Sequence, residues 1–110
     1  MKKVRLSDDA LLLREDIRAL VDKGYFSDED YAVAYMINVV RHFQLNAENL
    51  VHYKAPAFFN RFGVTSVPLQ YMKYIKNHKT TWYAFFEEND EYISIVYLNT
   101  NHAIGHLFAE

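Results

Sequence analysis

The stretch Leu69–Asn99, LQYMKYIKNHKTTWYAFFEENDEYISIVYLN, decides the fold of this chain. It contains three segments rich in Tyr, Phe, Thr, Ile and Val, which are typical strand residues. These segments are Leu69–Lys76, Thr80–Glu88 and Glu91–Asn99. Asn89–Asp90 suits a two-residue hairpin turn because both residues tolerate positive φ, and Asn77–His78 is a weaker turn of the same kind. The stretch therefore predicts an antiparallel β-meander of three strands, with a fourth at His102–Phe108 as an option.

Two amphipathic helices are predicted before this sheet. Apolar residues recur at helical spacing after Ser7, an N-cap candidate, as far as Gly24, a residue typical of helix ends. A second helix is predicted from Ser27, because three acidic residues would fill its first turn near the positive end of the helix dipole. The short linker between them predicts an antiparallel hairpin of helices Ser7–Lys23 and Ser27–Phe43.

The remaining segments complete an α+β fold. Val4 and Leu6 alternate with basic residues, which predicts a short N-terminal strand. Pro56–Gly63 predicts a short helix, with Pro at its start and Gly at its end. We expect residues 1–110 to form a single domain, in which the helical hairpin covers one face of a C-terminal antiparallel β-meander of three to four strands.

Composition excludes several classes of protein. The chain has no Cys, which excludes disulfide bonds and thiolate metal sites. Its start lacks the apolar run of a secretory signal, and no window reaches the length of a membrane span. We therefore expect a cytoplasmic protein with no membrane partner.

Charge is distributed unevenly along the chain. Residues 49–86 contain no Asp or Glu, whereas residues 1–48 carry a formal charge of −2 and residues 87–110 carry −5. The Lys and Arg residues of the acid-free segment are Lys54, Arg61, Lys73, Lys76 and Lys79. If this segment folds onto one face, it forms a local anion-binding site although the total charge is only −2. The alternative is a sheet surface that lysines keep soluble.

The predicted turns also determine the register of the sheet. With two-residue turns, the apolar pairs across the second hairpin are Trp82–Tyr97, Ala84–Ile95 and Phe86–Ile93, on a face that the helices would cover. The opposite face would be open. It would gather five side chains that suit RNA chemistry, namely Tyr74, Lys76, Lys79, Tyr83 and His102. A shift of one residue in the register would invert the two faces.

This predicted cluster combines the groups that RNA cleavage requires. Lysines bind a phosphodiester, phenol rings stack on a base, and an imidazole exchanges protons near neutral pH. Directly opposed Lys76 and Lys79 would be more easily tolerated with an anion between them. The alternative is that each Tyr packs the sheet and His102 is a hydrogen-bonded surface group. His102 and His106 are four residues apart, but no acid lies between them and no helix is evident, so we expect neither a metal site nor a cofactor.

Two runs of the sequence resemble a known family. Trp82–Phe86, within the run Tyr71–Glu87, stands where that family often has a strand reading Leu-Val-Tyr-hydrophobic. Asn99–His102, within the run Tyr97–Ala103, stands where some members carry a terminal-strand His used in cleavage. Together with the predicted β-α-α-β-β-β order, these runs resemble the RelE/ParE superfamily of toxins from toxin–antitoxin systems.

The resemblance implies a small cytoplasmic toxin of a type II module, neutralised by a cognate antitoxin protein and acting on ribosome-bound mRNA or on DNA gyrase. Ribonucleases of the family need no metal, because a ribose 2′-hydroxyl attacks the adjacent phosphate. By residue matching, Lys73 or Lys76 would hold phosphate, Tyr83 would stack on or position a base, and His102 would act as base or acid. From the predicted cluster, Lys76 and Lys79 would supply the catalytic charge, and the expected RNA-binding residues are Lys73, Tyr74, Lys54 and Arg61.

Two functions follow from these observations. The first is a metal-independent mRNA endoribonuclease, favoured by the acid-free segment with His102 close by in the sequence. The second is a non-catalytic protein-binding module of the same fold, either a gyrase-inhibitor-like toxin or an inactive relative. The second is favoured by Lys79-Thr80-Thr81, which stands where ribonuclease members often place an Arg, by the acidic C-terminal residues and by the nine Tyr.

Overall fold

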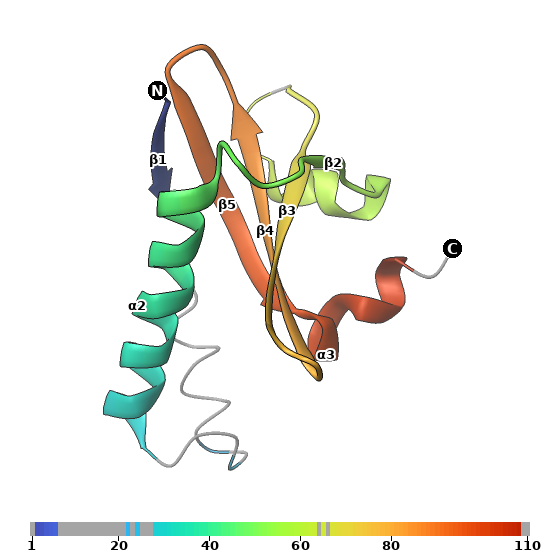
Figure 1. Ribbon diagram of the computed structural model, residues 1–110. Coiled ribbons are helices and arrows are strands. Elements are labelled where there is room, and N and C mark those ends of the chain that lie inside the picture. The colour runs from blue at the N-terminus through green and yellow to red at the C-terminus, as the bar shows by residue number, and fades with distance from the viewer. Residues whose placement is uncertain are drawn as a thin grey trace.

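The computed structural model describes residues 2–6, 22, 24, 28–63, 65 and 67–108. Within these ranges the fold is α+β: one long helix packs on one face of a mixed five-stranded sheet, and short helical segments pack on the other (Figure 1). The elements are β1 (Lys3–Leu6), α2 (Glu29–Asn46), β2 (Tyr53–Lys54), the 3₁₀ helix η2 (Ala57–Phe62), β3 (Gln70–Asn77), β4 (Thr80–Glu88), β5 (Tyr92–Thr100), α3 (Asn101–Ile104) and the 3₁₀ helix η3 (Gly105–Phe108). The strand order is β1-β5-β4-β3-β2.

Helix α2 begins at Glu29, two residues after the predicted start. Asp28, not Ser27, is its N-cap, and the Asp28 carboxylate accepts a hydrogen bond of 2.7 Å from the Tyr31 amide. The predicted first helix, Ser7–Lys23, lies outside the described residues except for Asp22, which is helical, and Gly24 has the positive φ of 82° that suits a helix C-terminal stop. None of the described helices is long and apolar enough to cross a membrane.

The sheet is larger than the predicted meander. The three predicted strands form β3, β4 and β5 as consecutive antiparallel neighbours. The predicted N-terminal strand forms β1, which pairs in parallel with β5 and makes the sheet mixed. The two-residue strand β2 at the opposite edge was not predicted.

The α2 face of the sheet forms the first core. Ala32, Met36, Val39 and Phe43 of α2 pack on Met72, Trp82, Ala84, Phe86, Ile93, Ile95 and Leu98. The predicted burial of Trp82 is confirmed, because only 3% of it is exposed and its indole N–H donates to the Tyr35 hydroxyl at 3.1 Å. The expected place of Tyr97 in this core was wrong, since Tyr97 lies on the opposite face and Leu98 takes its place.

The opposite face, predicted to be open, carries a second core. Phe59 of η2 stacks on Phe85 with ring centroids 4.2 Å apart, and Phe62 stacks on Tyr97 at 4.1 Å. Phe108 of η3 also packs on this face, with its ring 5.4 Å from that of Phe59. The sheet is therefore covered on both faces over much of its area.

Both hairpin turns lie one residue later than predicted. The turn residues are His78–Lys79 and Asp90–Glu91, and an Asn precedes each pair. The Asn77 side chain accepts hydrogen bonds from the amides of residues 79 and 80, and the Asn89 side chain accepts them from residues 91 and 92. Asn thus stabilises each turn through its side-chain oxygen rather than through a positive φ, which no described non-Gly residue adopts.

Two β-bulges change which side chains share a face. One lies between Ile75 and Asn77 on β3, and the other lies opposite Phe85 and Phe86, where β5 contributes one extra residue. Each extra residue inverts the facing of the strand beyond it. The later β3–β4 turn and the bulge on β3 together pair Tyr74 with Trp82 rather than Thr81.

The predicted fourth strand at His102–Phe108 was wrong, because this segment forms α3 and η3. The Asn101 side chain fastens the chain where it leaves the sheet: it accepts a hydrogen bond of 2.9 Å from the Thr81 amide and donates one of 3.1 Å to the Lys79 carbonyl. The predicted short helix over Pro56–Gly63 is confirmed as η2, with Pro56 and Gly63 as its flanking residues.

Candidate functional site

The five side chains expected on one open face are divided by the structure between both faces of the sheet and the β3–β4 turn. Tyr74 and Lys76 lie on the α2 side, Tyr83 lies on the opposite face, and Lys79 and His102 lie near the turn. The predicted opposition of Lys76 and Lys79 does not occur, because the bulge leaves Lys76 without a cross-strand partner.

Tyr74 and Lys76 contribute to the packing of α2 against β3. The Tyr74 ring stacks on the His42 ring with centroids 3.7 Å apart and planes 14° from parallel. The Lys76 ammonium lies 5.2 Å from the centre of the Tyr35 ring. Burial, and secondly the charge of Lys76, lower the pKa of His42. The Lys76 charge is therefore placed beside an imidazole that is favoured in its neutral form.

The β3–β4 turn keeps His102 and Lys79 in one neighbourhood. The His102 ring nitrogen Nε2 lies 3.2 Å from the Thr80 hydroxyl, and the ring is exposed to solvent. Lys79 is also exposed, and its carbonyl accepts the hydrogen bond from Asn101 at the start of α3. We call Lys79, Thr80, Asn101 and His102 the hairpin tip. An exposed imidazole beside a hydroxyl, at a turn that also carries a lysine, can bind an anion and transfer a proton.

An aromatic and cationic surface lies at the β2 edge of the sheet. The Tyr53 ring stacks on the Tyr71 ring with centroids 5.1 Å apart and planes 20° from parallel. The Lys73 ammonium lies 4.9 Å from the centre of the Tyr53 ring. We call Tyr53, Tyr71 and Lys73 the Tyr53 surface. Stacked rings with an ammonium group form a platform for a nucleic-acid base and its phosphate.

Tyr71 and Tyr83 connect this surface to the second core. Burial raises the pKa of Tyr71, with smaller contributions from Tyr83 and Tyr53, so its hydroxyl stays protonated as a hydrogen-bond donor. The Tyr83 ring stacks on Phe108 with centroids 4.7 Å apart and is half-buried. Tyr83 therefore offers less free ring surface for stacking than an open sheet face would have allowed.

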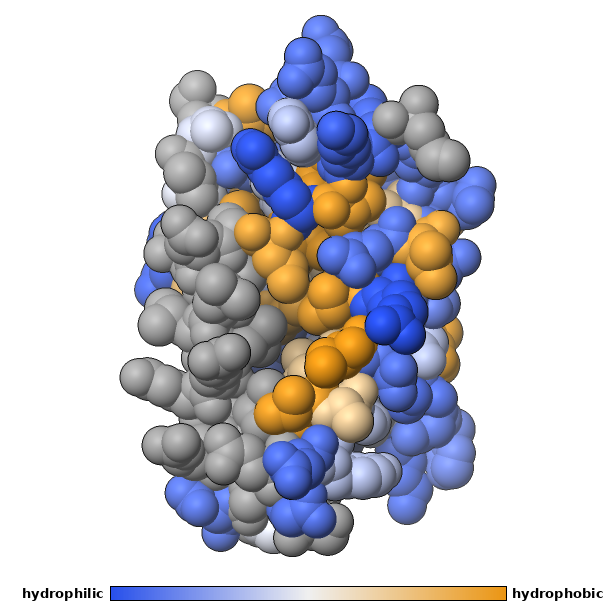
Figure 2. Space-filling view, turned by 90° about the vertical axis from the view of Figure 1, so that its left-hand side faces the viewer, coloured by the Kyte–Doolittle hydropathy of each residue, from blue (hydrophilic) through white to orange (hydrophobic). Residues whose placement is uncertain are grey.

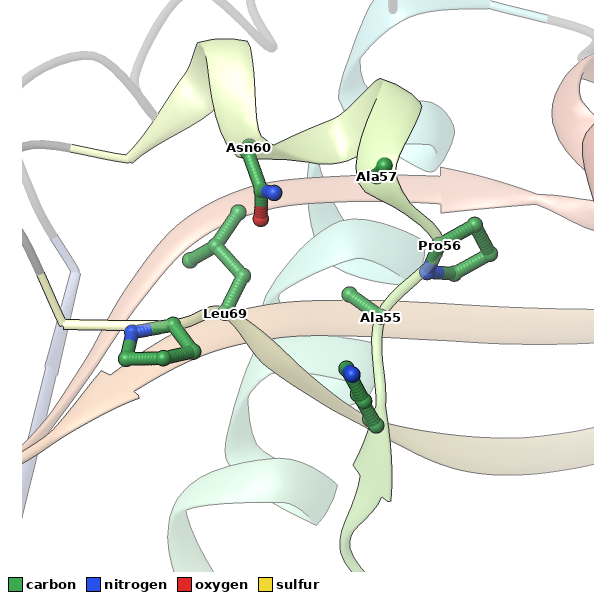
Figure 3. A pocket seen from close by; sticks show the side chains of 7 residues that line it. Ala55, Pro56, Ala57, Asn60 and Leu69 are labelled. Atoms are coloured by element: carbon green, nitrogen blue, oxygen red, sulfur yellow. The ribbon is translucent and has the colours of Figure 1, made fainter.

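The two remaining predicted RNA-binding residues lie near η2. The Arg61 guanidinium packs 3.9 Å over the Phe58 ring and donates to the Phe58 carbonyl. Lys54 follows Tyr53 on β2 and lines a pocket of about 430 Å³. The other residues that line this pocket are Ala55, Pro56, Ala57, Asn60, Pro68 and Leu69. Figure 3 shows Asn60 projecting from η2 toward Leu69.

Sequence reasoning missed Tyr53, Tyr71 and Asn60 as site residues. Tyr53 was missed because β2 is only two residues long and lies in a connector interrupted by proline. The available signal was the strand propensity of a Tyr within the acid-free segment. The pairing of Tyr53 with Tyr71 depends on a return of the chain to β3 that has no local signal.

Apolar side chains are also exposed on α2. Val33, Ile37 and Leu45 are 43%, 51% and 73% exposed, and Tyr31 is 56% exposed. Figure 2 shows apolar surface running along this side of the molecule, outside the part drawn in grey. Exposed large apolar residues on one helix are a feature of surfaces that contact other proteins.

Comparison with known proteins gives no matching family model, no similar curated protein and no similar solved structure. The function is therefore inferred from the chemistry of the Tyr53 surface and the hairpin tip.

Proposed function

We propose that this chain is a RelE/ParE-like toxin of a type II toxin–antitoxin module that binds single-stranded mRNA on the Tyr53 surface. The observation that carries the proposal is the stacked Tyr53–Tyr71 pair with the Lys73 ammonium over the Tyr53 ring. A base stacked on an aromatic side chain contributes about 1–3 kcal/mol, and this contribution is largely independent of sequence.

The electrostatic surroundings of the Tyr53 surface favour an RNA backbone. Strands β2 and β3 contain no acidic residue, because both lie within the acid-free segment. The first acids along β4 are already engaged: Glu87 accepts two hydrogen bonds from Thr65, and Glu88 forms an ion pair of 3.0 Å with Lys2. These carboxylates therefore do not neutralise Lys73 or Lys54, and both ammonium groups can attract a phosphate.

Cleavage, as the second part of the proposal, takes place at the hairpin tip. His102 removes the proton from a ribose 2′-hydroxyl, the 2′-oxygen forms a bond to the adjacent phosphorus, and the bond from phosphorus to the 5′-oxygen breaks. The leaving oxygen takes up a proton from water or from the protonated imidazole, which gives a 2′,3′-cyclic phosphate. Lys79 stabilises the charge that develops on the phosphate, so the reaction needs no metal.

The binding proposal is tested with purified protein and a short single-stranded RNA. Tyr53→Ala should weaken binding about 5- to 150-fold, the loss of one stacked base. Tyr31→Ala is the matched control, because Tyr31 is an exposed tyrosine on α2, and it should bind RNA as the wild type does. Equal affinities for the wild type and Tyr53→Ala would overturn the RNA-binding proposal.

The cleavage proposal is tested by induced expression in cells. His102→Ala should relieve growth arrest and abolish the 2′,3′-cyclic phosphate product, since loss of a general base costs ~10²–10⁴-fold in rate. His78→Ala is the control, because His78 is an exposed histidine in the same turn and is not part of the hairpin tip. Toxicity of His102→Ala equal to that of the wild type would remove His102 from the mechanism.

A second candidate function is a protein-binding module with the same fold, and the exposed apolar side chains of α2 favour it. In this case the partner is the antitoxin or a protein target such as gyrase. Co-expression with the adjacent reading frame of the native operon should yield a complex. Growth arrest by the wild type without any RNA cleavage would favour this second function over the first.

A further inference from the structure

The pocket beside Lys54 has the dimensions and the chemistry of a small-ligand site. Its volume of about 430 Å³ lies within the range of roughly 300–1,000 Å³ that is usual for ligand pockets. We propose that it receives one nucleobase of the RNA strand that binds the Tyr53 surface. This inference rests on the proposed function and extends it by assigning a base-recognition subsite.

The walls of the pocket suit a flat, partly apolar ring. Pro56, Pro68 and Leu69 supply apolar surface, and the alanines at positions 55 and 57 leave the space open. Asn60 supplies a carboxamide, which carries one acceptor and two donor hydrogens and can therefore form two hydrogen bonds with a base edge. Apolar walls with a single amide resemble the environments in which unstacked RNA bases are recognised.

The polar groups of the pocket are available for a ligand. Within the described part of the chain, the side-chain carboxamide of Asn60 has no hydrogen-bond partner and the Lys54 ammonium has no ion-pair partner. Both side chains are exposed, so a ligand can reach them without displacing another protein group. Lys54 would contact the phosphate that is attached to the bound nucleoside.

The location of the pocket explains how one strand could use both sites. Tyr53 lies on the same side of the sheet as the pocket, because the lining residues Ala55 and Leu69 share the second core with Tyr71, on which the Tyr53 ring stacks. Because Tyr53 and the pocket residue Lys54 are consecutive on the edge strand β2, RNA can run along this edge from the Tyr53 ring to the pocket. A base stacked on Tyr53 and a neighbouring base in the pocket are then compatible with one continuous strand.

The first experiment tests the pocket independently of RNA binding. The wild-type protein is titrated with each of the four nucleoside 5′-monophosphates, and amide chemical shifts are followed by NMR. We expect saturable shifts at Ala55, Ala57, Asn60 and Leu69 in the millimolar range for at least one nucleotide. Ala57→Phe fills the pocket and should remove these shifts, whereas Ala34→Phe, at an exposed alanine of α2, should keep them. Absence of saturable shifts at these residues in the wild type would overturn the pocket proposal.

The second experiment separates the pocket from the Tyr53 surface with single-stranded RNA. Asn60→Ala should weaken binding roughly 2- to 10-fold and reduce the difference in affinity between RNAs of different base composition. Asn38→Ala, at an exposed Asn of α2, is the matched control. If Tyr53→Ala weakens binding but Asn60→Ala and Ala57→Phe do not, the pocket proposal is wrong and the proposed function stands. If nucleotides shift the pocket residues but no RNA binds, the proposed function is wrong and the pocket remains a nucleotide site.

Discussion

Replacement of Phe59 by Ala tests whether the face opposite α2 carries a real core. Phe59 is fully buried, stacks on Phe85 at 4.2 Å and contacts Phe108 at 5.4 Å. Truncation of a buried Phe to Ala typically costs about 3–5 kcal/mol, which includes the cavity left behind. A chain of 110 residues has a free energy of unfolding of about 5–15 kcal/mol, so this loss is a large fraction of the total.

Phe58 provides the matched control because it is the neighbouring Phe on the same 3₁₀ helix and is 40% exposed. Phe58 is only partly buried, and the Arg61 guanidinium packs over its ring. Phe58→Ala should therefore lower the free energy of unfolding by about 1–2 kcal/mol. The two variants should therefore differ by at least about 1 kcal/mol. If the second core is loosely packed, truncation of Phe59 leaves a smaller cavity and the difference between the two variants is smaller.

Urea unfolding followed by circular dichroism measures both values. With a denaturant slope of about 2 kcal/mol/M, a loss of 4 kcal/mol lowers the unfolding midpoint by about 2 M. If Phe59→Ala does not fold, Phe59→Leu, which keeps most of the apolar volume, replaces it in the comparison with Phe58→Ala. If Phe59→Ala costs no more than Phe58→Ala, the second core is absent and the face is open, as the simple register had predicted.

Two further predictions concern α2. Because the folded-state pKa of His42 is lowered, the unfolded chain binds more protons, and stability should fall as the pH drops from above about 6.5 through the folded pKa. His42→Gln should flatten this part of the stability profile in urea unfolding, and an unchanged slope would contradict the assignment. Asp28→Ala removes the N-cap acceptor of α2 and should cost about 1 kcal/mol at neutral pH, whereas Asp30→Ala, two residues later in the first turn, should cost less. Thermal unfolding monitored at 222 nm, a helix-sensitive wavelength, compares the two variants, and equal losses would argue against Asp28 as the cap.

Local sequence signals predicted most elements of the described fold. Strands β3, β4 and β5, the helix α2 and the short helix η2 follow from residue propensity, alternation, helical periodicity and end signals, all of which depend on neighbours in the sequence. The burial of Trp82 was also predictable, because the alternation of β4 places it on the same face as Ala84 and Phe86.

The candidate site depended on more than these local signals. Asn77 and Asn89 each hold a turn that begins one residue later than a simple reading of the turn residues indicates. A turn that begins one residue later shifts the cross-strand pairing by two residues, so every side chain keeps its face of the sheet. The bulge at Lys76 shifts the pairing by one residue and thereby moves Tyr74 to the α2 side. The predicted cluster separated for this reason: Tyr74, Lys76 and Tyr83 keep their strands, but Lys79 becomes a turn residue and His102 lies in α3.

The sequence by itself determined the strands β1, β3, β4 and β5, the helices α2 and η2, which residues are apolar enough to be buried, and where the acid-free segment lies. Only the tertiary structure decided the register, the second core and the pairing of Tyr53 with Tyr71. The physical reason is that propensity acts between residues close in the chain, whereas register is chosen by packing on both faces of the sheet at once. A bulge is accepted where it lets Val96 and Tyr97 contribute to one core while Ile95 and Leu98 remain in the other.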